Sequence, residues 1–204
     1  MLDDRNPSEA TPPEAGDVEK ADIELGTKLA KHRDHPVAKA AAKAGKIGDQ
    51  GPLYALSAGL LAVGISSRDR RLTDTGLSML AAIATADVAK RVVKRLVHRT
   101  RPHVVLDEGR YQADAGGSDD KHEQSFPSGH MAGTTAVARA LARNHPEAGA
   151  VAAAAAIGIG MSRIAKGAHW PLDVAAGAVI GLAAEGFAAL FFADRRRQRR
   201  KTWW

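Results

Sequence analysis

A histidine and a carboxylate lie four residues apart in the sequence GAHWPLD, shortly after the pair Ser162-Arg163. This spacing lets the Asp173 carboxylate face His169 if a helix begins near Trp170 or earlier. A carboxylate on one ring nitrogen fixes the tautomer of a histidine and leaves the other nitrogen basic and nucleophilic. The pattern therefore predicts that His169 is a nucleophile with Asp173 as its orienting partner. Taken alone, it fits equally well an aspartate that only caps the next helix.

A second polar stretch reads KRLVHRTRP and contains Lys94 and Arg101, which are seven residues apart. Seven residues are about two helical turns, so both side chains would project from one face of a helix that continues to Arg101. Pro102 favours a helix end at that residue, because a proline disfavours the helical conformation of its predecessor. Two cations on one face would form an anion clamp. The alternative is an ordinary basic flank of a membrane helix.

A third stretch reads FPSGH and opens an apolar, helix-prone segment. Ser128 occupies the predicted N-cap position, and Gly129 lets the backbone approach a ligand closely. Free N–H groups and the helix dipole favour phosphate at such a helix start. His130 would then lie in the first turn, close to a bound anion. The alternative is a capped helix with a surface histidine.

The composition limits the chemistry further. The 204 residues fit one domain and include no cysteine, which excludes disulfides, thiolate metal sites and a thiol nucleophile. The net charge of +6 is unevenly distributed, because residues 1–24 are acidic whereas residues 195–201 read RRRQRRK. A basic surplus fits nucleic acid, anionic lipid or a phosphorylated substrate. We interpret residues 1–20 as a disordered acidic tail. Residues 195–204 are interpreted as a basic cytoplasmic tail at anionic headgroups, because they follow an apolar helix directly.

Five apolar segments without alternation predict an all-α domain over residues 21–194. We expect a membrane-embedded helical bundle with a five- to six-helix core. Only the last segment clearly reaches the ~20 residues that a membrane span needs. Hydropathy alone therefore also fits buried helices of a soluble bundle, although the many small residues suit close packing in lipid. A sixth, weaker element would come from residues 21–46, which Pro36 interrupts. The five segments are 53–66, 72–89, 131–142, 148–161 and 172–192.

Arginine clusters follow the first, third and fifth segments, so they fall on one side if every segment crosses. The positive-inside rule places that side in the cytoplasm. The opposite side receives residues 90–130 and 162–171, which hold all three polar stretches, although 90–101 is itself basic. Residues 107–121 are predicted to be a mobile polar loop that covers the site. The number of crossings, the side of the N-terminus and the oligomeric state stay open.

Together, the patterns K-x6-R-P, P-S-G-H and S-R-x5-H-x3-D resemble the signature of the type 2 phosphatidic acid phosphatase superfamily. This superfamily also contains bacterial nonspecific acid phosphatases and vanadium haloperoxidases. Every position of the pattern is present, and the resemblance covers about residues 48–192. It implies that His169 attacks phosphorus and forms a phosphohistidine, that Asp173 holds its imidazole, and that His130 protonates the leaving oxygen. It implies no metal and no cofactor. The phosphate-binding groups that it implies are Lys94, Arg101, Ser128, Gly129 and Arg163.

The resemblance and the apolar segments together predict a membrane phosphatase. Its substrate would be a lipid phosphate monoester or diphosphate, such as phosphatidic acid, phosphatidylglycerol phosphate or a polyprenyl (di)phosphate. We expect a multi-pass protein of the bacterial inner membrane, with its active site facing the periplasm or exterior, a cytoplasmic C-terminus and no nucleic-acid partner. Three alternatives stay open: a soluble nonspecific acid phosphatase, a vanadate-dependent haloperoxidase, and a non-catalytic membrane protein that binds lipid. The segments rich in Ala, Leu and Gly do not reveal which lipid phosphate is bound.

Overall fold

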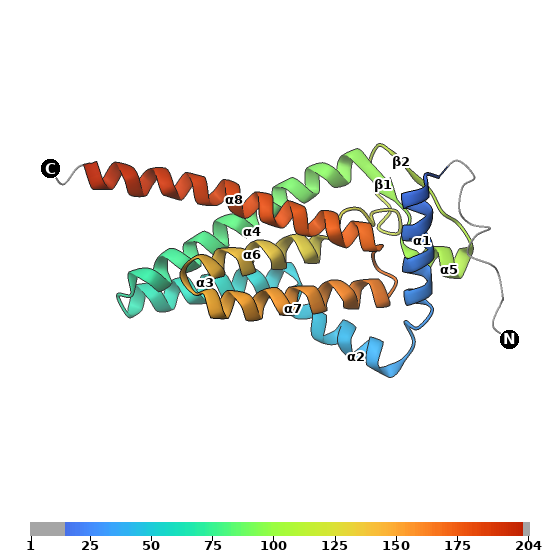
Figure 1. Cartoon of the computed structure of the whole chain (residues 1–204), viewed down its shortest axis with the longest axis horizontal. Helices are drawn as coiled ribbons and strands as arrows, with labels where there is room; N and C mark the ends of the chain where they lie inside the picture. Colours follow the sequence, from blue (N-terminus) through green and yellow to red (C-terminus); the bar gives the residue numbers. More distant parts are fainter. Residues whose placement is uncertain (1–14, 202–204) are drawn as a thin grey trace. The chain divides into compact units, whose positions relative to one another are not determined.

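Helices make up nearly all the regular structure of the chain (Figure 1). The computed structural model describes residues 15–201, with side chains described for residues 15–191. The expected all-α fold is confirmed, apart from a short ribbon of strands β1 (Val97–Arg99) and β2 (Ala113–Ala115). The helices are α1 (Asp17–Ala30), α2 (Pro36–Ala44), the 3-10 turn η2 (Gly45–Gly48), α3 (Gln50–Ser66), α4 (Arg70–Leu96), α5 (Pro102–Glu108), α6 (Gly129–Asn144), α7 (Pro146–Ala165) and α8 (Pro171–Lys201).

The five predicted apolar segments all lie within helices, namely α3, α4, α6, α7 and α8. Each helix includes flanking polar residues beyond its apolar segment, and the extension is longest at the ends of α4 and α8. Pro146 and Pro171 are the first residues of α7 and α8. Proline is favoured there, since its missing N–H would have no partner in the helix and its φ is already helical. Pro36 likewise begins α2, so residues 21–46 form two helices.

The chain folds into two compact units. The first comprises Met1–Lys46, Lys90–Ser128 and Gly158–Gly177. In this unit α1 packs against α5 (Figure 1). Trp170, which is fully buried, contacts Ile23 and Val105 in a small apolar cluster. Its indole nitrogen donates a hydrogen bond to the Thr100 carbonyl over 2.7 Å. These contacts hold the start of α8 close to the end of β1.

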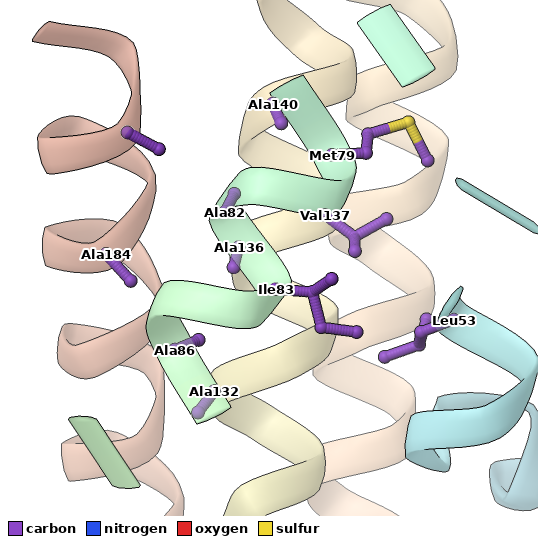
Figure 2. Packing of buried hydrophobic residues seen from close by; sticks show 11 residues of the cluster. Leu53, Met79, Ala82, Ile83, Ala86, Ala132, Ala136, Val137, Ala140 and Ala184 are labelled. Atoms are coloured by element: carbon purple, nitrogen blue, oxygen red, sulfur yellow. The ribbon is translucent and has the colours of Figure 1, made fainter. Parts of the chain in front are cut away.

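The second unit comprises Ile47–Ala89, Gly129–Ile157 and Ala178–Trp204. Its core is built mainly from alanines of α4, α6 and α8, with Leu53, Met79 and Ile83 filling the larger gaps (Figure 2). Small side chains let the helix backbones approach closely. One close approach is at Gly181, where an added Cβ would lie 2.5 Å from the Ala132 carbonyl oxygen. A glycine is therefore needed where α8 meets α6.

Within the described residues, two helices are long and apolar enough to cross a membrane, Pro146–Ala165 and Pro171–Phe191. Only 39% and 28% of their apolar windows are buried inside the molecule. Large apolar side chains instead point outward, including Val151, Phe187 and Leu190, which are 68–72% exposed. The core helix of a soluble protein is mostly buried, so this exposure favours contact with lipid.

The predicted helix through Arg101 is wrong. Helix α4 ends at Leu96, and β1 follows it, pairing antiparallel with β2 so that Val97 lies opposite Ala115. Pro102 begins α5 instead of merely ending a helix. The segment 107–121, expected to be a mobile loop, contains β2 and is joined to α4 by a hydrogen bond from Gly116 N to Leu96 O over 2.8 Å. Pairing between distant segments therefore overrode the local helical pattern.

The two predicted tails differ in part from the structure. Helix α1 begins at Asp17, so the last residues of the expected 1–20 tail are helical. Asp17 and Glu19 in its first turn complement the helix dipole. Residues 1–14 lie outside the described part of the chain. In the predicted basic tail, the backbone of residues 195–201 continues α8, whereas residues 202–204 lie outside the described range.

Candidate active site

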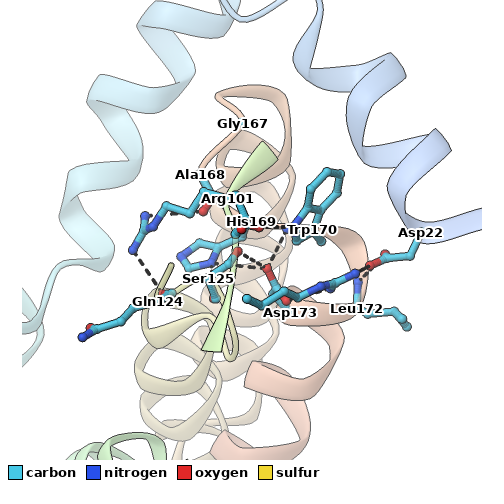
Figure 3. Close-up of polar contacts among 12 residues, drawn as sticks. Asp22, Arg101, Gln124, Ser125, Gly167, Ala168, His169, Trp170, Leu172 and Asp173 are labelled. Atoms are coloured by element: carbon cyan, nitrogen blue, oxygen red, sulfur yellow. Dashed lines mark hydrogen bonds and ion pairs between the residues drawn. The ribbon is translucent and has the colours of Figure 1, made fainter. Parts of the chain in front are cut away.

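His169 lies in the turn between α7 and α8 and is 4% exposed (Figure 3). Its Nδ1 lies 2.8 Å from the carbonyl oxygen of Ser125. A carbonyl can only accept a hydrogen bond, so this contact requires the proton on Nδ1 and leaves the lone pair on Nε2. A nucleophilic histidine needs this tautomer. The sequence pattern predicts that Asp173 selects this tautomer. In the structure, the Ser125 backbone carbonyl selects it.

Asp173 is fully buried, and its Oδ2 lies 3.8 Å from His169 Nδ1, which is an electrostatic contact too long for a hydrogen bond. Three donors hold the carboxylate in place. Trp170 N and Ser125 Oγ donate to Oδ2 over 2.8 and 2.5 Å, and Arg99 Nη1 donates to Oδ1 over 3.0 Å. A buried, fixed negative charge at this distance stabilises positive charge that develops on the imidazole.

Arg99 links Asp173 to a second buried carboxylate, Asp22 of α1, at 2.7 Å. Asp22 in turn accepts a hydrogen bond from Leu172 N over 2.8 Å, so α1 contacts the first turn of α8. Burial raises the pKa of Asp22, while the bond from Leu172 and the charge of Arg99 act in the opposite direction. The Arg99 guanidinium also lies 5.4 Å from the Trp170 ring centroid. The sequence pattern does not reveal this network, because it predicts a helix through Arg99 and not the strand β1.

Lys94 and Arg101 come together without sharing a helix. Lys94 Nζ and Arg101 Nη2 both donate to the carbonyl oxygen of Gln124, over 2.6 and 3.3 Å. Arg101 Nη1 also lies 3.4 Å from the carbonyl of Ala168, the residue before His169. The two cations therefore converge beside the histidine, as the clamp hypothesis required, although by a different backbone route.

Burial is the main influence on the charges of this site. It lowers the pKa of His169, against the opposing effect of Asp173, and the nearby positive charges of Arg101 and Lys94 lower it further. The imidazole is therefore neutral at pH 7, as a nucleophile must be. Burial, followed by repulsion from Arg101, lowers the pKa of Lys94 to about 8. Most Lys94 ammonium groups are thus still protonated at pH 7.

The other predicted residues are divided between the units. Arg163, 7% exposed in the last turn of α7, belongs to the first unit, and its Nη2 lies 3.4 Å from the Ala42 carbonyl. Ser128 belongs to the same unit, directly precedes α6, and its N–H donates to the Asp173 carbonyl over 2.9 Å. Gly129 and His130 are the first residues of α6 and belong to the second unit. There His130 Nε2 contacts the Asp49 carboxylate.

The chemistry of the first unit suits an anionic electrophile. A buried neutral histidine with a free Nε2 lies beside two cations, with a fixed carboxylate supporting its other side. This combination can attack an atom that carries negatively charged oxygens and stabilise the charge that moves. Among residues 15–191, no cluster of His, Asp or Glu side chains has the arrangement of a metal site.

Comparison with known proteins gives consistent results. The model of the PAP2 superfamily matches residues 75–197. The chain is 32% identical to a lipid A 1-phosphatase of Rhizobium johnstonii, covering 58% of this chain and 48% of that protein. It is 35% identical to a non-specific acid phosphatase of Salmonella typhi, covering 43% and 35%. It therefore spans about half, or less, of these curated relatives.

Solved structures share the fold. The transmembrane PAP2 type phosphatidylglycerolphosphate phosphatase from Bacillus subtilis superimposes with a TM-score of 0.64 at 21% identity, covering 89% of each chain. Aquifex aeolicus LpxE gives a TM-score of 0.58 at 23% identity, covering 82% of this chain and 93% of its own. At these identities the likeness concerns the fold.

Proposed function

Because the chain belongs to the PAP2 superfamily, we propose that it is a membrane phosphatase that hydrolyses a lipid phosphate monoester or diphosphate without a metal. The predicted family, the type 2 phosphatidic acid phosphatases, is thereby confirmed. The observation that carries the proposed activity is the geometry of His169, whose Nδ1 is fixed by the Ser125 carbonyl and whose Nε2 is therefore available for attack.

In the proposed reaction, His169 Nε2 attacks phosphorus in line, and the bond from phosphorus to the lipid oxygen breaks. The phosphoryl group passes to the imidazole, and the positive charge that develops there is stabilised by Asp173. His130 donates a proton to the leaving oxygen and then accepts one from the water that hydrolyses the phosphohistidine. The nonbridging oxygens are bound by Lys94, Arg101, Arg163, Ser128 and the N–H of Gly129.

A lipid substrate is supported by the exposed apolar surfaces of α7 and α8, which would lie in a bilayer. These surfaces count against a soluble acid phosphatase or a soluble haloperoxidase. Two similar proteins carry names that specify lipid phosphates, lipid A and phosphatidylglycerolphosphate. We place the protein in the bacterial inner membrane, with the site facing outward, the C-terminus in the cytoplasm and no nucleic-acid partner.

The test is phosphate release from phosphatidic acid and phosphatidylglycerol phosphate by purified protein in detergent with a metal chelator. Wild type should turn over, and brief incubation with a ³²P-labelled substrate should trap label on a histidine. His169→Ala should lose both properties, because the attacking lone pair belongs to Nε2 of this residue. Asp173→Asn should keep its fold and slow turnover by about a hundredfold or more, because catalytic histidines depend strongly on a partner carboxylate.

His32→Ala is the matched control, because His32 is an exposed histidine of the same unit. It should turn over like wild type. Turnover retained by His169→Ala would reject the nucleophile, and inhibition by the chelator would reject metal independence. Halide oxidation with vanadate and peroxide, without phosphatase activity, would establish the haloperoxidase alternative.

A further inference from the structure

A polar cavity of about 380 Å³ opens beside Lys94 in the first unit. One wall is the end of α4, which contributes Arg91, Lys94 and Arg95. The other wall is the loop after β2, which contributes residues 117–119 together with Gln124. The Gln124 carbonyl is the acceptor shared by Lys94 and Arg101, so this basic cavity adjoins the proposed phosphate site.

The basic cavity has a surplus of positive charge. Three cations line it, against one carboxylate, that of Asp119. Arg91, Lys94 and Arg95 lie at helical spacings of three and four residues, so their side chains occupy neighbouring positions on α4. The proposed phosphoryl transfer uses Lys94 but neither arginine. A guanidinium group can donate two parallel hydrogen bonds to two oxygens of one phosphate. The wall formed by α4 is therefore suited to a phosphate-type anion.

The loop wall is built by specific contacts. Gln124 Nε2 donates to the Ser118 carbonyl over 2.6 Å, and Ser118 Oγ donates to the Glu123 carboxylate over 2.7 Å. Gly117 packs directly on α4, where an added Cβ would lie 2.9 Å from the Arg95 carbonyl oxygen. The loop is therefore held against the helix at a fixed distance, and the basic cavity has a defined width.

We propose that the basic cavity binds a second anionic phosphorus group of the substrate. The preferred lipid then carries either a diphosphate or a phosphomonoester with a phosphodiester nearby. This inference rests on the proposed phosphatase function. With the transferred phosphate at Lys94, the second group comes within reach of Arg91 and Arg95. When a diphosphate is cleaved, the lipid phosphate leaves with its negative charge, which these arginines neutralise.

The experiment compares two lipids with identical acyl chains in nonionic detergent micelles: phosphatidic acid, with one phosphorus group, and phosphatidylglycerol phosphate, with two. In the double variant Arg91→Gln/Arg95→Gln, kcat/KM for the second lipid should fall about tenfold or more, as expected for lost hydrogen bonds to a charged group. Phosphatidic acid should change by less than about twofold, because its single phosphate contacts neither arginine. Lys28→Gln, which removes an exposed positive charge from α1, should leave both rates unchanged.

A second variant tests the geometry. Gly117→Ala pushes the loop away from Arg95 without changing charge, and should reduce the rate on phosphatidylglycerol phosphate selectively, measured at a temperature where the variant is fully folded. Equal losses on both lipids would overturn the inference and assign the arginines to general contact with the lipid surface. Unchanged rates would also overturn it. If the rates on both lipids are unchanged but inorganic phosphate inhibits the double variant less strongly, the basic cavity binds only free phosphate and the inference is overturned. If wild type hydrolyses neither lipid, the proposed function itself fails.

Discussion

At the scale of single residues, two separate groups prepare the His169 imidazole. The Ser125 carbonyl fixes the tautomer of His169, while Asp173 supplies a buried charge 3.8 Å away. Arg99 holds the Asp173 carboxylate in position and also forms an ion pair with Asp22. The pattern S-R-x5-H-x3-D records only side chains, so it could not show a backbone acceptor that comes from a segment forty-four residues upstream.

Lys94 gives the clearest dependence on pH. Burial and Arg101 lower its pKa to about 8, so its positive charge is present below pH 8 and is lost as the pH rises through that value. We therefore expect kcat/KM for a lipid phosphate to fall on the alkaline side with a midpoint near 8, since kcat/KM reports ionisation of the free enzyme. Lys94→Arg should move this midpoint upward by more than about one unit, because a guanidinium stays protonated. A midpoint that is the same in both proteins would assign the titration to another group.

At the scale of elements, the apolar segments were predictable because each is a mainly apolar run without the alternation of a strand. Even their order and approximate ends follow from composition and proline positions. The stretch from Leu96 to Pro102 was not predictable, because its strand depends on pairing with residues 113–115. A three-residue strand facing the sequence Ala-Asp-Ala carries no alternation that could reveal it. The buried role of Arg99 was missed for the same reason, since it follows from β1 replacing the expected helix.

The packing of α8 on α6 can be tested with two glycines of one helix. At Gly181 an added Cβ would lie 2.5 Å from the Ala132 carbonyl, whereas at Gly186 it would meet nothing within 4 Å. Gly181→Ala should therefore lower thermal stability in detergent, by about 1–3 kcal/mol as expected for overpacking. Gly186→Ala should leave it unchanged or raise it slightly, because alanine favours the helix. Equal melting temperatures for the two variants would contradict the close approach.

At the scale of the whole molecule, the absence of cysteine makes membrane topology easy to measure. Single cysteines can be placed at Ser67, between α3 and α4, and at Asp120, in the loop after β2. In intact bacterial spheroplasts, an impermeant maleimide should label Asp120→Cys but reach Ser67→Cys only after lysis, because we propose that the site faces outward and the arginine-rich turn faces the cytoplasm. Recovery of the protein in the soluble fraction without detergent would contradict the membrane location, and labelling of both positions from one side would contradict the topology.

The Gln124 carbonyl, which receives donors from both Lys94 and Arg101, has a consequence for turnover. Two like charges are held side by side by an oxygen that belongs to the protein, so their repulsion is already offset when a substrate arrives. In the proposed reaction, phosphate binding is an exchange of one acceptor oxygen for another, which requires little rearrangement. The same exchange runs in reverse after hydrolysis. The Gln124 carbonyl then competes with inorganic phosphate for Lys94 and Arg101. This competition favours release of the phosphate product.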